Sequence, residues 1–303
     1  MAWRSVVIGN PARLKLKHRG LLVEQDNGSV TVPLEDIAAL VIDHPQVTLT
    51  AQLLSACAGH QIAVITVDSS HTPNGVLLSH LPHSRALKVM RAQLALGLPA
   101  RKRLWQGIIQ RKILNQAELL ARHGHTDACA RLHAMALEVR SGDPDNIEAQ
   151  AAQVYFRMLF GTAFHREQSR FYNAALNYGY SILRSALARS LVSYGFLPAF
   201  GLHHHNEQNA FNLADDLIEP YRPVVDAQVL AHHPSEPERD LETTDKSRLV
   251  GLLHLDAPRL DETGQAGYSA LLALIDTTVV SLSQRLADGG NQLTLPGMPT
   301  CYE

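Results

Sequence analysis

The first quarter of the chain carries short apolar runs that are typical of β-strands. Residues 38–42 (AALVI) and 62–67 (IAVITV) are continuously apolar, which is the pattern of strands buried on both faces of a sheet. The sequence DNG at 26–28 lies between two further apolar runs and is a strong hairpin signal. Thr50 is placed to cap a short helix between the buried runs. We therefore expect a small β-rich domain at residues 1–78.

The pattern turns helical after this region. Residues 68–84 are rich in Ser, His and Pro, which is typical of a linker, and we set the domain linker at 79–88. Further on, apolar residues recur at helical spacing, for example over 147–158 and over 268–286. The sequence thus predicts an α+β protein in which a larger all-α domain, residues 89–303, follows the β-rich one.

The composition is that of a globular protein, with 46% hydrophobic and 18% charged residues. No apolar run approaches the roughly 18–20 residues that span a bilayer, and the first residues lack the apolar core of a signal peptide. Three cysteines without ligand-like spacing are typical of a reduced protein. We expect a cytoplasmic protein that makes no membrane contact.

Positive charge gathers at the start of the helical region. Arg85, Lys88 and Arg91 follow one another at intervals of three, so that they form one stripe on a helix. Five more basic residues follow: Arg101, Lys102, Arg103, Arg111 and Lys112. Such a run is either a solvated helix face or a surface that contacts phosphates.

Residues 201–226 carry the clearest chemical signal, a His triplet followed by several carboxylates. If 212–219 is helical, Glu219 shares a face with Asp215, four residues earlier, and with Asp216, three residues earlier. Carboxylates with one imidazole suit Mg²⁺ or Mn²⁺ better than structural zinc. The alternative is an acidic first helical turn that complements the helix dipole, after a polar loop.

Glu148 is a second candidate, at the start of the helix predicted at 147–158. Ala151 and Ala152 stand one turn further on, and these small residues leave room in front of the carboxylate for a substrate or an ion. The alternative is that Glu148 only complements the N-terminus of its helix.

Four stretches together carry a resemblance: IEAQAAQVYF around Glu148, NAALNYGYSILR from Asn173, GLHHHNEQNAFNLADDLIEPYRP from Gly201, and LTLPG from Leu293. The chain resembles CRISPR-associated protein one, the DNA integrase of spacer acquisition, and looks closest to the branch from type II systems. The resemblance spans essentially the whole chain. It implies a β-rich dimerisation domain followed by a helical catalytic domain.

The family pattern uses a glutamate on one helix, a histidine in a Gly-x-x-His setting, and an acidic residue on the following helix. By this resemblance the glutamate is Glu148 and the final acid is Glu219. The histidine is His204, with His203 and His205 as competitors in the triplet. These three residues are expected to be both the catalytic residues and the metal ligands.

Asp216 stands where the family often keeps a second carboxylate, which would touch the metal directly or through water. The resemblance implies Mg²⁺ or Mn²⁺ as the cofactor. A hard cation held in this way polarises a phosphate and lowers the pKa of the attacking group. The attacking group would be the 3′-hydroxyl of a spacer precursor for integration, or water for cleavage.

The resemblance also implies a DNA path and protein partners. The residues expected to contact double-stranded DNA are Arg85, Lys88, Arg91, Arg101, Lys102, Arg103, Asn177 and Tyr178. The family works as a homodimer and joins CRISPR-associated protein two in a heterohexamer. In type II systems the effector nuclease and an accessory adaptation protein also take part.

Two other functions fit the same residues. A stand-alone, structure-selective metal-dependent nuclease would use the same site to hydrolyse DNA without joining strands. A helical DNA-binding scaffold would use the acidic-histidine loop only for structure, so that alanine at Glu148 or His204 would change stability alone.

Overall fold

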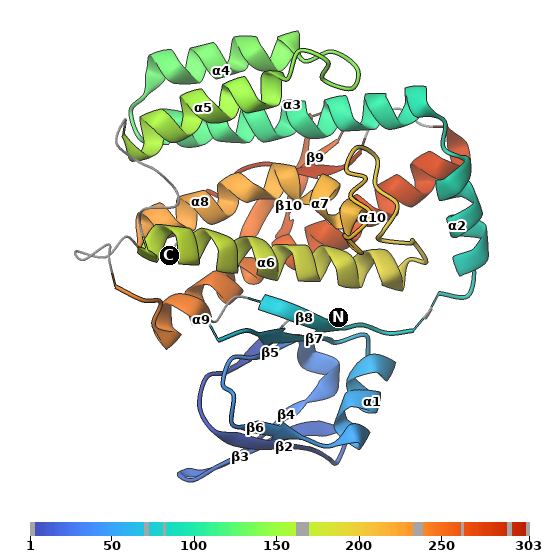
Figure 1. The fold of residues 1–303 in the computed structure, drawn as a ribbon, viewed down its shortest axis with the longest axis vertical. Helices are drawn as coiled ribbons and strands as arrows, with labels where there is room; N and C mark the ends of the chain where they lie inside the picture. Colours follow the sequence, from blue (N-terminus) through green and yellow to red (C-terminus); the bar gives the residue numbers. More distant parts are fainter. Residues whose placement is uncertain are drawn as a thin grey trace.

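Two four-stranded sheets form the N-terminal domain of the computed structural model, which describes residues 4–69, 73–80, 83–161, 170–232, 239–261, 264–289 and 293–300 (Figure 1). The first sheet has the order β1 (Arg4–Ile8), β5 (Ile37–Ile42), β7 (Ala63–Val67) and β8 (Pro73–Leu77), with only β8 antiparallel to its neighbour. The second has the order β4 (Gly28–Pro33), β3 (Gly20–Gln25), β2 (Ala12–Lys17) and β6 (Val47–Leu49). A 3₁₀ turn, η1 (Leu34–Asp36), and one helix, α1 (Ala51–Gly59), complete the domain.

The hairpin, the helix cap and the fully buried strand at 38–42 that the sequence predicts in this domain are confirmed. The β3–β4 hairpin turns at the predicted DNG, and Thr50 caps α1 by accepting the backbone N–H of Leu53 at 3.3 Å. Strand β5 is buried along its whole length. Its Leu40 belongs to the core of the β domain, whereas Val41 belongs to the core of the helical domain. The continuous apolar run therefore reflects a strand that serves two cores.

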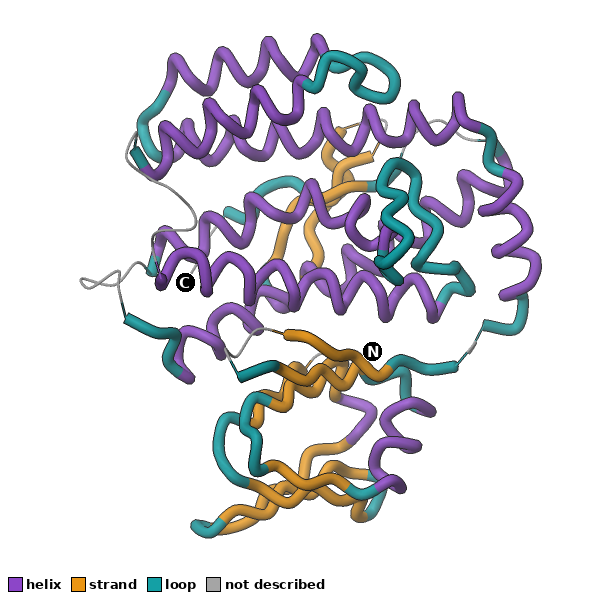
Figure 2. Tube along the Cα trace, in the orientation of Figure 1, coloured by secondary structure: helices purple, strands orange, loops and turns teal. Residues whose placement is uncertain are grey.

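The helical domain lies in layers above the first sheet, β1-β5-β7-β8 (Figures 1 and 2). Helices α3 (Leu98–Arg122), α4 (Thr126–Glu138) and α5 (Ile147–Phe160) form the outer layer, which α2 (Ala86–Ala95) connects to the β domain. Beneath it lie α6 (Arg170–Ser193), α7 (Asn212–Ile218), η2 (Glu219–Tyr221), α8 (Arg222–Ala231), α9 (Thr243–Gly251), η3 (Leu252–His254) and α10 (Leu271–Asp288). Helix α6 packs on β7 and β8, and α9 packs on β1.

An ion pair joins the two domains beside β5. Lys246 of α9 places its Nζ 2.8 Å from Asp43 Oδ2, and both side chains are almost fully buried. Because a buried ion pair costs desolvation and is sensitive to geometry, it fixes the relative position of the elements that carry it.

The predicted α+β fold, with a helical domain after the β-rich one, is confirmed, but the C-terminal domain is not entirely helical. It carries a three-stranded sheet of order β10 (Gly264–Ala270), β9 (Asp256–Asp261) and β11 (Leu295–Pro296). The helix expected from Tyr268 begins only at Leu271, because Tyr268, Ser269 and Ala270 pair with β9.

The predicted linker overlaps regular secondary structure. The segment expected to be a linker contains β8, whose pairing with β7 makes it part of the sheet, and α2 begins inside the 79–88 boundary. Within the residues that the structure describes, no helix is long and apolar enough to cross a membrane.

Candidate active site

Glu148 stands at the start of α5, where the chain is held by Asp143. The two carboxylate oxygens of Asp143 accept the backbone N–H groups of Ile147 at 2.9 Å and Glu148 at 3.0 Å. Asn146 before the helix takes a left-handed conformation, which an asparagine tolerates. This turn, together with the packing of α5 on α3, directs the Glu148 side chain toward α3.

Glu219 approaches the same place from another part of the chain. It opens η2, which is tied to α3 because Asn115 donates to the Pro220 carbonyl at 2.8 Å. The Glu219 side chain is nearly buried, and its Oε1 accepts from Arg222 Nε at 2.8 Å.

Lys112 of α3 connects the two carboxylates. Its Nζ lies 2.5 Å from Glu148 Oε1 and 2.5 Å from Glu219 Oε2. Burial acts to lower the pKa of Lys112, but the charges of Glu219 and Glu148 outweigh it and the pKa is raised. Burial acts to raise the pKa of Glu219, and Lys112 with Arg222 reverses this, so that the pKa is lowered. Both groups are therefore charged at neutral pH.

His204 is held by Asp216. Its Nδ1 lies 2.7 Å from Asp216 Oδ1, and this carboxylate is completely buried. The hydrogen bond to Asp216 is the main reason that the pKa of His204 is raised, and the charge of nearby Glu219 adds to it. Because Nδ1 is taken by Asp216, Nε2 is the ring nitrogen left to bind a ligand.

The loop before α7 wraps around the same carboxylate. Asp216 accepts the backbone N–H groups of Leu202 at 2.5 Å, His203 at 3.2 Å and His204 at 3.0 Å. A Cβ on Gly201 would stand 2.3 Å from the His204 carbonyl oxygen and 2.6 Å from Asp216 Oδ2. The loop can thus close on Asp216 only with glycine at 201, which is a physical reason for the Gly-x-x-His spacing.

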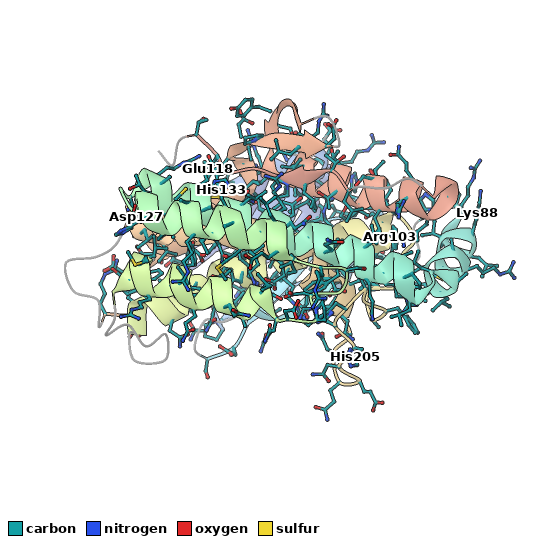
Figure 3. All side chains as sticks on the ribbon, turned by 90° about the horizontal axis from the view of Figure 1, so that it is seen from above. Lys88, Arg103, Glu118, Asp127, His133 and His205 are labelled. Carbon is teal, nitrogen blue, oxygen red and sulfur yellow. The ribbon has the colours of Figure 1, made fainter. Side chains whose placement is uncertain are left out.

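The three histidines of the triplet occupy different environments. The His203 ring stacks on Trp105 of α3 at 4.2 Å between centroids, and His204 meets the same ring edge-on at 5.6 Å. His205 projects from the loop at the edge of the molecule (Figure 3) and contacts the His203 carbonyl oxygen. This arrangement favours His204 as the ligand, as the motif predicts.

Asp215 and Asp216, the two acids that share a face with Glu219 by spacing, have separate roles. Asp215 pairs with Arg184 at 2.5 Å and accepts from Asn209. Both oxygens of Asp216 are engaged by the loop and by His204. Of these three acids, Glu219 is the one that shares a partner, Lys112, with Glu148.

The donor set suits a hard divalent cation, since two carboxylates converge on one point and an imidazole nitrogen is available nearby. As the side chains stand, however, no three His, Cys, Asp or Glu residues in the described part of the chain are close enough to hold a metal. The point shared by Glu148 and Glu219 is taken by the Lys112 ammonium. The two carboxylates are the kind of ligand that such a cation prefers, and the Lys112 ammonium holds the point between them in this structure.

A family model described as "CRISPR associated protein Cas1" matches residues 6–236. The chain belongs to the Cas1 family. It is 43% identical over 298 residues to the CRISPR-associated endonuclease Cas1 of Neisseria meningitidis serogroup C (strain 8013), covering 98% of this chain and 96% of that protein. The family resemblance carried by the four sequence stretches is thereby confirmed.

Solved structures share the Cas1 fold of this chain at low sequence identity. A casposase bound to integration product has a TM-score of 0.72 and 18% identity, over 97% of this chain and 93% of that one. A Cas6-RT-Cas1–Cas2 complex has a TM-score of 0.73 and 20% identity, over 96% of this chain and 36% of the longer one.

The basic residues predicted to contact DNA lie at one end of this Cas1-family protein. Figure 3 places Lys88 and Arg103 at the same end of the molecule. Arg85, Arg91 and Lys102 are exposed as well. Arg101 is only half exposed, because its Nε donates to the Leu96 carbonyl at 2.9 Å, where α2 ends.

The two residues predicted on α6 behave differently. Asn177 donates to Asn173 at 3.0 Å and stays partly exposed. Tyr178 is 1% exposed and lies in the core of the helical domain, where burial is the main reason that its pKa is raised. The prediction that Tyr178 contacts DNA was therefore wrong for this conformation, since the ring faces the domain interior.

Lys112 and Trp105 were not recognised as site residues from the sequence, although a signal was present. Lys112 continues a buried stripe of α3 that includes Trp105, Ile108 and Ile109 at helical spacing. A lysine inside such a stripe needs an acidic partner, since buried charges are paired.

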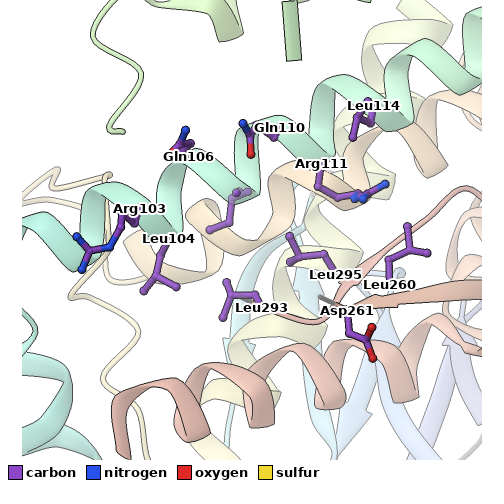
Figure 4. Close-up of a pocket in the computed structure, with 12 residues that line it drawn as sticks. Arg103, Leu104, Gln106, Gln110, Arg111, Leu114, Leu260, Asp261, Leu293 and Leu295 are labelled. Atoms are coloured by element: carbon purple, nitrogen blue, oxygen red, sulfur yellow. The ribbon is translucent and has the colours of Figure 1, made fainter. Parts of the chain in front are cut away.

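A separate pocket of about 480 Å³ lies between α3 on one side and β9 with the segment around Leu293 and Leu295 on the other (Figure 4). It is lined by Arg103, Gly107, Gln110, Arg111 and Leu114 of α3. At 100° per residue these positions centre on the side of the helix opposite Lys112. The pocket is therefore distinct from the carboxylate site.

Proposed function

We propose that this chain is a metal-dependent DNA integrase and endonuclease of CRISPR adaptation, which inserts spacer DNA into the repeat array by attack of a 3′-hydroxyl on a phosphodiester. The observation that carries the proposal is the convergence of Glu148 and Glu219, 71 positions apart in the sequence, on one buried point. Family membership and the structural likeness to a casposase bound to integration product support it.

Glu148, Glu219 and His204 Nε2 would hold Mg²⁺ or Mn²⁺. When bound, such a cation polarises the phosphate and lowers the pKa of the attacking hydroxyl. Asp216 orients His204 from the Nδ1 side and favours the tautomer that leaves Nε2 open, as carboxylates commonly do for ligating histidines. Arg222 keeps Glu219 charged and fixed in direction by its hydrogen bond to Oε1.

Double-stranded DNA would approach along the exposed cations of α2 and the start of α3, with Asn177 as a supporting contact. The β-rich domain would form the homodimer, and Cas2 would join two such dimers in a heterohexamer. The likeness to the Cas1 part of a Cas6-RT-Cas1–Cas2 complex supports a Cas2 partner. The type II effector nuclease and an accessory adaptation protein would complete the assembly.

The test is strand transfer on a branched DNA that mimics a half-integrated product, with Mn²⁺ or Mg²⁺. The unmodified protein should rejoin the strands, and Glu148→Gln, His204→Ala and Glu219→Gln should each abolish the joined product while the fold persists by circular dichroism. Joining that survives these substitutions would contradict the proposal.

A second candidate is a stand-alone, structure-selective nuclease that uses the same three residues. It is favoured by the name of the Neisseria relative, an endonuclease. Cleavage without joining, at the same rate with and without Cas2, would select this function instead.

A further inference from the structure

Lys112 is a buried cation at the centre of the proposed metal site. Its side chain is 10% exposed, and its Nζ is 2.5 Å from one oxygen of each of the two carboxylates. Divalent cations bind carboxylate oxygens at about 2.0–2.6 Å. The ammonium therefore occupies the position for which the carboxylate pair is suited.

Among the four side chains joined by ion pairs at this point, the charges already balance. The two carboxylates of Glu148 and Glu219 are matched by two cations, Lys112 and Arg222. A divalent cation added to this group would face the ammonium at short range in a poorly solvated place, where like charges repel strongly. Metal binding thus requires that Lys112 leave the carboxylates.

The structure allows this movement for Lys112 more readily than for Arg222. A lysine ammonium is a compact charge on a flexible four-carbon stem, whereas Arg222 is also held over the Tyr180 ring at 4.6 Å. The backbone of Lys112 lies in the middle of α3, fixed by the packing of α4, α5 and η2. A displaced ammonium therefore stays within reach of the same centre.

We propose that Lys112 is the resident counter-ion of this centre, that a divalent metal displaces it from Glu148 and Glu219, and that the displaced ammonium then contacts a phosphate of the bound DNA. The inference rests on the proposed function. A phosphodiester beside the metal offers the ammonium a negatively charged partner in place of the two carboxylates. A positioned cation also stabilises the charge that develops on phosphate oxygens during the reaction.

Metal and DNA then bind with positive coupling. Each ligand favours the displaced position of the Lys112 ammonium. The metal excludes the ammonium from the two carboxylates, and the phosphate accepts a hydrogen bond from it. By thermodynamic linkage, DNA must raise the affinity for metal by the same factor by which metal raises the affinity for DNA.

The first test uses the unmodified protein and reductive methylation of its lysines, followed by mass spectrometry. Lys112 should be protected without metal and become methylated several-fold faster with saturating Mn²⁺. Lys246 is the internal control, because its side chain is also almost fully buried but pairs with Asp43 rather than with Glu148 or Glu219. Its labelling should not change.

The second test compares Mn²⁺ affinity in Lys112→Met and in the matched variant Lys246→Met, by electron paramagnetic resonance of free Mn²⁺. Without DNA, Lys112→Met should bind Mn²⁺ about tenfold more tightly, the factor that corresponds to removing a competing interaction of about 1.4 kcal/mol. In the unmodified protein, bound DNA should raise the Mn²⁺ affinity, and Lys112→Met should lose most of this increase. Lys246→Met should be less stable, with unchanged Mn²⁺ affinity.

Distinct outcomes overturn the two proposals. Mn²⁺ that binds while Lys112 stays protected, or a folded Lys112→Met with weaker Mn²⁺ affinity, would mean that Lys112 only braces the carboxylates. Mn²⁺ that does not bind the unmodified protein, or binds equally well to Glu148→Gln, would overturn the proposed metal centre and this inference with it. If Lys112→Met does not fold, the labelling of the unmodified protein decides.

Discussion

His204 Nδ1 lies 2.7 Å from Asp216 Oδ1, and the same carboxylate accepts three backbone N–H groups of the loop that carries the histidine. One buried acid thus sets both the path of the loop and the direction of the ring. This is the arrangement found around metal-binding histidines, where an acceptor on one nitrogen orients the other.

Asp216→Asn should weaken the orientation of the His204 ring and lower its pKa while the histidine itself stays in place. Asn is similar in shape but uncharged, and the hydrogen bond to Asp216 is the main cause of the raised His204 pKa. We expect the pKa of His204 in the metal-free protein to fall toward 6.5, and strand transfer to drop about 10–100-fold. NMR titration of the His204 ring measures the first effect, and an unchanged pKa would contradict the account.

The same pair predicts a pH dependence of stability in the metal-free protein. The folded-state pKa of His204 is raised above 6.5, so the charged pair contributes stability that is fully present below pH 6.5 and is lost as pH rises through the raised pKa. The difference in unfolding free energy between the unmodified protein and Asp216→Asn should accordingly narrow as pH rises. Urea unfolding at several pH values measures it.

Gly201→Ala should disrupt the loop, because the added Cβ would lie 2.3 Å from the His204 carbonyl oxygen. We expect a loss of about 1–3 kcal/mol of stability, as for overpacking, together with loss of strand transfer. Gly107→Ala is the control: nothing lies within 4 Å of its added Cβ in α3, and it should stabilise the helix by about 0.5–1 kcal/mol. Equal effects of the two substitutions would show that the contact at Gly201 is unimportant.

Lys102→Glu combined with Arg103→Glu should weaken DNA binding and reduce its salt dependence. Both residues are exposed at the start of α3, and each phosphate contact contributes about one unit to the slope of log affinity against log salt. Fluorescence anisotropy over a range of salt concentrations measures this. Tyr178→Phe, inside the core, should leave DNA binding unchanged, and an unchanged slope in the double variant would remove this surface from the DNA path.

The sequence predicted those parts of the fold that local pattern determines. Thr50 as a helix cap, the DNG hairpin and the buried β5 run were recognisable because each depends on a few neighbouring residues. Strand β10 was not, because Tyr268 and its neighbours pair with β9 only in the folded chain. Their apolar spacing continues that of α10, so the pattern alone suggested a longer helix.

The candidate site was likewise predicted only in part. Glu148, His204 and Glu219 were named from a motif, and the structure brings the two carboxylates to one point. The role of Lys112 was missed, because it depends on the packing of α5 and η2 on one face of α3. Tyr178 was misplaced because spacing along a helix does not tell which face meets the core.

The most direct measurement is an anomalous difference map from crystals grown with Mn²⁺. The account predicts one strong peak within about 2.6 Å of Glu148, Glu219 and His204 Nε2, with the Lys112 ammonium moved away from both carboxylates. A peak elsewhere, or no peak with Lys112 still between Glu148 and Glu219, would contradict it.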